Sequence, residues 1–292
     1  MSWTSIADLI VDDPSASVAI LGAPMEAGSV TPGRCDLAPA AVRRALRRFS
    51  TWDLTADLAL DLAIHDAGDV PVQGIMPADG FLPIRDAVEA SVLAHDLTLL
   101  LGGNNAVTRP AAHGLGLPLE KVGLITFDAH FDMRDTSGGP MNGNPVRCLL
   151  EDGLPGENIV QIGLAPFANT FEMSELAKAE GVGIYHLDRI GGDIMRVVGE
   201  AMGQLDRANV EAVMIDFDID VIDRAQCPGA PGARPGGLPV RDFFRAARAA
   251  LAFPKVRLVD LTEFDPSLDL SDITALTAGR WVCEVLAGYC RR

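Results

Sequence analysis

This chain of 292 residues lacks long apolar runs and closely paired cysteines, the features typical of membrane-spanning, disulfide-rich and zinc-ribbon proteins. No stretch of about 18 apolar residues runs without interruption, so the sequence predicts no membrane-spanning helix. The cysteines are odd in number and never form a C-x-x-C pair, which argues against a disulfide framework and against a zinc ribbon. They are Cys35, Cys148, Cys227, Cys283 and Cys290.

Basic residues are also in short supply. The chain has 24 lysines and arginines against 40 aspartates and glutamates, and its formal net charge is −16. A chain this acidic is not expected to bind nucleic acid or an anionic membrane. Its first residues, M-S-W-T-S-I-A-D-L-I-V-D-D, place no basic region before an apolar core, so we expect no signal peptide and a soluble, cytoplasmic protein.

Short apolar runs alternate with helix-like stretches from one end of the chain to the other. The expected strands are 18–23, 58–65, 97–101, 122–127, 159–162, 183–187, 210–215 and 256–261. The expected helices are 40–49, 84–95, 170–180, 194–205, 240–251 and 273–286. This alternation favours a parallel sheet of about eight strands with helices on both faces. With no linker rich in Gly and Ser, residues 1–292 are expected to form a single α/β domain.

Polar motifs follow several of the expected strands, at the edge where ligands bind in parallel α/β sheets. The stretch T-F-D-A-H-F-D covers 126–132 and follows an apolar run. Alternate side chains of an extended segment share a face, so Asp128, His130 and Asp132 are expected to point the same way.

A second acidic motif, D-F-D-I-D, covers 216–220 and follows another apolar run. By the same alternation Asp218 and Asp220 share a face. The alternative for either motif alone is a solvated acidic loop, but two such motifs at strand ends favour a metal site. Two divalent ions would balance the four aspartates, and carboxylates with one imidazole suit manganese.

Four segments together resemble the ureohydrolase superfamily, which includes arginases, agmatinases and formimidoylglutamases. They are L-L-G-G-N-N-A at 100–106, D-A-H-F-D at 128–132, D-F-D-I-D-V-I-D at 216–223 and E-F-D-P-S-L-D at 263–269. The resemblance implies one α/β domain with a central eight-stranded parallel sheet in a three-layer α/β/α arrangement. It also implies two manganese ions and a homo-oligomer, either a trimer or a hexamer.

The resemblance also assigns roles to residues. Asp128 and Asp218 correspond to ligands that bridge the two ions, and His130 and Asp220 to ligands of one ion. Asp132 corresponds to a ligand of the other ion that also accepts a hydrogen bond from a bridging hydroxide. Glu263 corresponds to the glutamate that receives an amidine or guanidine group, so Asp132 and Glu263 are the expected catalytic residues.

Three positions depart from the family pattern. Asn105 stands where a histidine ligand is usual; an amide oxygen can bind manganese, but more weakly, so one ion is expected to be weak or absent. Asp216 replaces a small residue and adds a carboxylate on the ligand face. Asn142 stands where arginases have a proton-shuttling histidine, which makes arginase activity itself less expected.

The substrate is less well determined by the sequence than the metal site. The loops around the site contain Arg109, Arg134 and Arg147, and arginine suits the carboxylates of N-formimidoyl-L-glutamate, an intermediate of histidine degradation. We therefore expect Asn142, Arg147 and Glu263 to contact this substrate. The alternatives are an agmatinase or guanidino-acid hydrolase that releases urea, and a non-catalytic member with impaired metal binding.

Overall fold

The computed structural model describes residues 3–208 and 210–292, and a nine-stranded sheet runs through its centre. Every strand pairing in this sheet is parallel. In spatial order its strands are β1 (Ile10–Val11), β5 (Ile64–Asp69), β2 (Val18–Ala23), β6 (Leu97–Gly102), β11 (Val256–Thr262), β10 (Ala212–Asp218), β7 (Val122–Phe127), β8 (Ile159–Leu164) and β9 (Gly183–His186).

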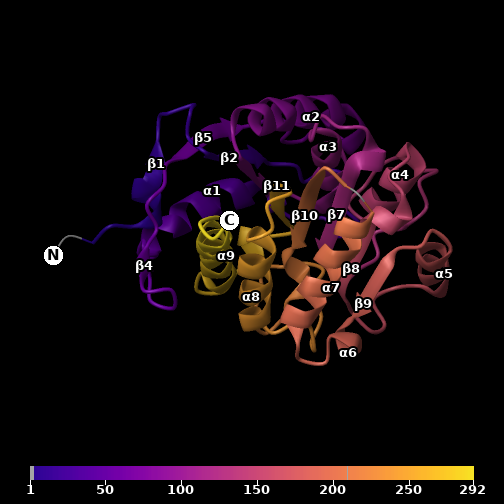
Figure 1. Ribbon diagram of the computed structural model, residues 1–292. Helices are drawn as coiled ribbons and strands as arrows, with labels where there is room; N and C mark the ends of the chain where they lie inside the picture. The colour runs from indigo at the N-terminus through magenta and orange to yellow at the C-terminus, as the bar shows by residue number, and fades with distance from the viewer. Residues whose placement is uncertain (1–2, 209) are drawn as a thin grey trace.

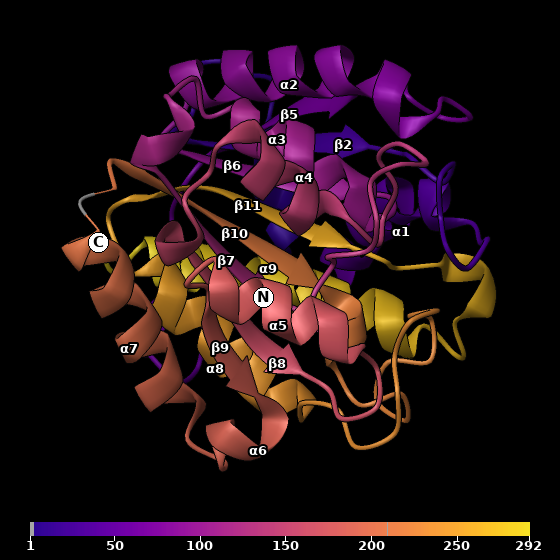
Figure 2. The same cartoon turned by 90° about the vertical axis from the view of Figure 1, so that its right-hand side faces the viewer.

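Helices cover both faces of the sheet and give three layers (Figures 1 and 2). On one face lie α1 (Ala38–Ala45), α7 (Ile194–Arg207), α8 (Val240–Leu251) and α9 (Ile273–Tyr289), whose apolar residues form one core with the sheet. On the other face lie α2 (Pro77–Ala94), α3 (Thr108–His113), α4 (Pro145–Asp152) and α5 (Phe171–Ala179) over a second core. The short helix α6 (Leu187–Ile190) follows β9. No helix of the described segments has the length and apolar character needed to cross a membrane.

Alternation along the central strands directs side chains to opposite cores. Phe127 and Phe217, on the neighbouring strands β7 and β10, point toward α8 and α9, and their rings stack with centroids 4.9 Å apart. The intervening residues Leu124 and Met214 point into the other core. Asp128 and Asp218 continue this second face at the carboxyl ends of the strands, so the buried sheet itself places the two acidic motifs side by side.

The structure corrects several expected boundaries. The sheet has nine strands rather than eight because the two-residue strand β1 is added at its edge beside β5. The expected strand 58–65 was wrong as one element: β4 (Leu58–Ala59) pairs with β3 (Trp52–Asp53) in an antiparallel hairpin, and β5 begins only at Ile64. The short helices α3 and α4 were missed because six or eight residues carry too little periodicity to distinguish them from a loop.

Candidate metal centre

Three residues of the two acidic motifs meet at the carboxyl ends of β7 and β10. In His130, Nδ1 lies 3.3 Å from an Asp128 oxygen and 3.0 Å from an Asp220 oxygen. One potential ligand atom from each of these residues lies within 4.8 Å of the others. The second carboxylate oxygen of Asp128 is buried and has no hydrogen-bond partner in the described part of the chain. A metal ion is the partner that this ligand set fits.

Backbone hydrogen bonds fix the acidic loops tightly. The N–H of His130 donates to Asp128 over 2.6 Å, and the N–H of Asp220 donates to Asp218 over 2.8 Å. The second bond caps the short 3-10 helix η7 (Ile219–Val221), which turns the chain directly after β10. The same turn therefore ends the strand and brings Asp220 back beside His130.

The electrostatics of the cluster call for positive charge. Burial, reinforced by the neighbouring Asp220, raises the pKa of Asp128 to about 6. Burial also raises the pKa of Asp218 well above its ordinary value, with the charges of Asp220 and Asp128 adding to the effect. The negative charge of Asp220 raises the pKa of His130 to about 12 against the opposing effect of burial. Protonated His130 supplies positive charge to the Asp128 and Asp220 oxygens, and a bound cation would supply it in the same place.

Asp132 lies on the same loop but faces Asn105. The side-chain Nδ2 of Asn105, in the 3-10 helix η4 (Asn105–Val107), donates to Asp132 over 2.5 Å. The Asn105 oxygen that was expected to be a ligand accepts instead from the hydroxyls of Thr108 and Thr262. Asp132 has a φ of 51°, a left-handed conformation that costs a residue with a side chain about 1–3 kcal/mol.

Glu263 follows β11 and also has a positive φ, of 60°. One of its carboxylate oxygens accepts from the backbone N–H of Asn105 over 2.8 Å and from the side chain of Asn142 over 3.0 Å. Burial raises the pKa of Glu263 to about 7, although these two hydrogen bonds oppose the rise. Asn142 also accepts from the N–H of Val30, so it links the Pro- and Gly-rich loop after β2 to the glutamate.

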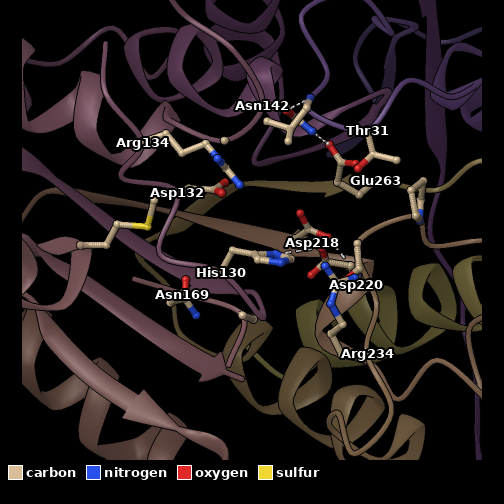
Figure 3. Close-up of a pocket in the computed structure, with 16 residues that line it drawn as sticks. Thr31, His130, Asp132, Arg134, Asn142, Asn169, Asp218, Asp220, Arg234 and Glu263 are labelled. Carbon is tan, nitrogen blue, oxygen red and sulfur yellow. Dashed lines mark hydrogen bonds and ion pairs between the residues drawn. The ribbon is translucent and has the colours of Figure 1, made fainter. Parts of the chain in front are cut away.

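A pocket opens above these residues (Figure 3). Its lining includes His130, Asp132, Asn142, Asp218, Asp220 and Glu263, so most of the expected site residues converge there. Two exposed arginines, Arg134 and Arg234, also line it, and Figure 3 shows them on opposite sides of the carboxylates. Neither arginine makes an ion pair within the described ranges 3–208 and 210–292.

Arg147, expected to contact the substrate, is placed elsewhere. It lies in α4, and its guanidinium pairs with Glu151 one helical turn later over 3.0 Å, outside the lining of the pocket. Arg109 likewise pairs with Asp152 over 2.7 Å. The sequence pattern predicts a loop here, whereas the structure has the helix α4, and the i, i+4 pairing with Glu151 turns Arg147 away from the site.

The sequence interpretation missed Gly232 and Arg234. A Cβ on Gly232 would overlap a carboxylate oxygen of Asp220 and lie 3.2 Å from the ring of His130, so only glycine allows this close approach. Both residues belong to the segment P-G-A-P-G-A-R at 228–234, directly after the second acidic motif. A Pro- and Gly-rich loop in that position was the signal that could have revealed them.

Comparisons with known proteins agree with this geometry. A model of the arginase family matches residues 16–288. The chain is 30% identical over 282 residues to a formimidoylglutamase of Halalkalibacterium halodurans, which covers 93% of this chain and 86% of the relative.

Two solved structures are similar in fold. The formimidoylglutamase of Bacillus subtilis superposes with a TM-score of 0.92 at 27% identity, covering 98% of this chain and 92% of that one. The formiminoglutamase of Trypanosoma cruzi, solved with two Mn²⁺ ions, superposes with a TM-score of 0.91 at 21% identity and covers 100% of both chains.

Proposed function

Because the chain belongs to the arginase family, we propose that it is a manganese-dependent hydrolase that converts N-formimidoyl-L-glutamate to L-glutamate and formamide. The observation that carries the proposal is the charge arrangement of one pocket. Buried carboxylates lie at its base, and Arg134 and Arg234 stand at its rim without carboxylate partners among the described residues. N-formimidoyl-L-glutamate has the complementary pattern, with a cationic amidine at one end and two carboxylates at the other.

The proposed metal ligands are Asp128, His130, Asp132, Asp218 and Asp220, with Asn105 contributing its amide oxygen. Two manganese ions, when bound there, would lower the pKa of a water molecule and make it available to attack the amidine carbon. The Asp132 carboxylate would accept a hydrogen bond from that water and orient it. The buried Glu263 carboxylate holds the cationic amidine, and Asn142 keeps the glutamate in place.

The two arginines provide the specificity for the amino-acid part. Each guanidinium can bind a carboxylate through two parallel hydrogen bonds, and an acidic substrate gains from both. A cationic substrate such as agmatine would place its second amine among these positive charges. The pocket therefore favours the formimidoyl substrate over guanidino amines.

A substrate panel tests the proposal. We expect manganese-loaded enzyme to release formamide from N-formimidoyl-L-glutamate with far higher kcat/KM than it releases urea from agmatine or 4-guanidinobutyrate. Preferential release of urea would replace the proposal with the guanidino-hydrolase alternative. If no substrate turns over and Asp128→Ala binds as much manganese as the unaltered protein, the chain is a non-catalytic member of the family.

We further propose a cytoplasmic homo-oligomer, a trimer or a hexamer, that acts on a small molecule and binds neither nucleic acid nor membrane. The net charge of −16 supports the last two points through repulsion of anionic partners. Sedimentation equilibrium at several protein concentrations tests the oligomer. A monomeric mass at all concentrations would contradict it.

A further inference from the structure

The amide of Asn105 sits in a closed network of buried hydrogen bonds. Its Nδ2 donates to Asp132 over 2.5 Å, and its Oδ1 accepts from Thr108 over 2.7 Å and from Thr262 over 3.1 Å. Asn105, Thr108 and Thr262 are each no more than 1% exposed, so bulk water does not reach these groups. In this orientation a cation bound to Asp132 would face the hydrogens of an NH2 group, which cannot act as a ligand.

Rotation of the amide by 180° exchanges its oxygen and nitrogen. Both threonine hydroxyls, which now donate to the amide oxygen, would then have to accept hydrogen bonds from the amide nitrogen. A threonine hydroxyl that accepts in this way needs a different acceptor for its own hydrogen, because an unsatisfied buried group costs about 1–3 kcal/mol. A threonine that has such an acceptor removes this cost from the rotation, and the cost at a threonine without one must be offset by the bond between the cation and the released oxygen.

Thr108 has that second acceptor. Its hydroxyl lies 3.2 Å from the Oδ2 atom of Asp260, in addition to the 2.7 Å contact with Asn105. Asp260 is fully buried, and its side chain also hydrogen-bonds to that of the buried Asp216, its register partner on the neighbouring strand β10. For Thr262 the structure records one acceptor among those segments, the Asn105 oxygen itself. The two threonines thus contact the same amide but differ in this one respect.

We propose that Thr108 and Asp260 form a relay that turns the Asn105 amide oxygen toward the metal ion beside Asp132. The Thr108 hydroxyl rotates and donates to Asp260, the Asn105 NH2 donates to Thr108, and the Asn105 oxygen is released as a ligand. No covalent bond changes, and each hydrogen moves with the group that carries it. This inference rests on the proposed function, since it concerns the proposed manganese centre. It makes Thr108 and Asp260 positioning residues for an amide ligand.

The first test compares two chemically equal substitutions. Thr108→Val and Thr262→Val each remove one hydroxyl from the same amide, and only the first breaks the relay. We expect Thr108→Val to weaken the binding of one of two manganese ions about 10- to 100-fold, the range for lost outer hydrogen bonds at a metal site. Thr262→Val should have a much smaller effect, and Thr108→Ser, which keeps the hydroxyl, should bind both ions normally.

The second test reverses the polarity of the relay. Asp260→Asn offers an NH2 group to Thr108, so the Thr108 hydrogen is driven back toward Asn105 and the amide oxygen is withdrawn from the ion. We expect the same selective loss of one ion as in Thr108→Val. In an Asn105→Ala background, neither substitution should change manganese affinity further, because the amide through which both act is gone.

Manganese stoichiometry after equilibrium dialysis, together with the electron paramagnetic resonance signal of coupled Mn²⁺ pairs, reports the outcome without any activity measurement. Circular dichroism identifies variants that fail to fold, and the Asn105→Ala background then separates folding from orientation. Equal manganese affinity in Thr108→Val, Thr262→Val and the unaltered protein would overturn the relay. Asp128→Ala distinguishes the two levels: if it also binds two ions normally, the proposed metal centre itself is wrong.

Discussion

The side chain of Asn142 donates a hydrogen bond of 3.0 Å to Glu263 across 121 residues of sequence. The same Asn142 accepts from the N–H of Val30, a residue that lines the pocket. Asn142 therefore connects three loops: the one after β2, its own, and the one after β11. Asn142 thereby supports Glu263, the residue proposed to hold the amidine group of the substrate.

Asn142→Ala removes this support, and we predict a roughly 10-fold rise in KM, since one hydrogen bond to a charged group contributes about 1.5 kcal/mol. Asn142→Asp should raise KM further, because it places a second carboxylate against Glu263. Steady-state kinetics at saturating manganese measures both effects. Manganese stoichiometry should remain normal in both variants, and an unchanged KM would refute the supporting role.

Arg134→Ala and Arg234→Ala should each raise KM for N-formimidoyl-L-glutamate about 10-fold or more, because each removes a guanidinium from the pocket. Arg109→Ala and Arg147→Ala are matched controls, since both arginines pair with acidic residues outside the pocket. These controls should leave KM close to that of the unaltered enzyme. A larger effect in Arg147→Ala than in Arg234→Ala would favour the original sequence-based assignment.

Gly232→Ala should weaken manganese binding by roughly 10- to 100-fold without unfolding the protein. The added methyl group would overlap the Asp220 carboxylate and lie against the ring of His130, so these two proposed ligands must move apart. Gly138→Ala is the control, because nothing lies within 4 Å of the Cβ it would add. Equal metal affinity in the two variants would show that the loop around Gly232 can shift to accommodate the methyl group without displacing Asp220 or His130.

Asp152 provides a pH-dependent contribution to stability. Burial by itself would raise the pKa of Asp152, but hydrogen bonds from His113 and Arg109 outweigh it and lower the pKa to about 2 from an ordinary value of 3.8. The stabilisation is therefore complete above pH 3.8 and is lost as the pH falls toward 2.

Asp152→Asn should accordingly reduce the free energy of unfolding at pH 7 by roughly 1 kcal/mol, after allowance for solvent screening. The difference from the unaltered protein should shrink as the pH is lowered from 4 toward 2. Urea denaturation across this range measures it. A difference that stays constant with pH would mean that packing, not charge, stabilises this contact.

Phe167 has a φ of 62° and a fully exposed side chain in the turn after β8. It follows Pro166, and the N–H of Ala168 bonds to the carbonyl of Ala165 over 3.4 Å, an arrangement in which glycine normally takes the third position. We predict that Phe167→Gly stabilises the protein by about 1 kcal/mol, because it removes backbone strain without loss of packing. Thermal denaturation tests this, and a lower Tm would indicate that the ring has a stabilising contact.

Much of the fold could be predicted from local pattern. The strand Val18–Ala23 and the helix Val240–Leu251 have the bounds that their apolar patterns predicted. A fully buried strand shows as a short continuous apolar run, and an amphipathic helix shows as apolar residues at helical spacing. The hairpin at 52–59 was not recognised, since a two-residue strand is too short to show alternation. Because helix α4 was not predicted, the sequence interpretation placed Arg147 in a loop beside the site. The structure pairs Arg147 with Glu151 along this helix, outside the lining of the pocket.

The sequence by itself determined the acidic motifs, their position after buried strands and the face of the sheet on which Asp218 lies. That information is local, because alternation along a strand fixes direction without knowledge of the neighbours. Strand alternation did not extend to His130 and Asp132, because β7 ends at Phe127 and a bend follows it. Only the tertiary structure decided which arginines reach the pocket, how Gly232 approaches Asp220, and that Thr108 connects the amide of Asn105 to Asp260. Those relationships join residues as many as 152 positions apart, and they depend on the order in which the strands pair.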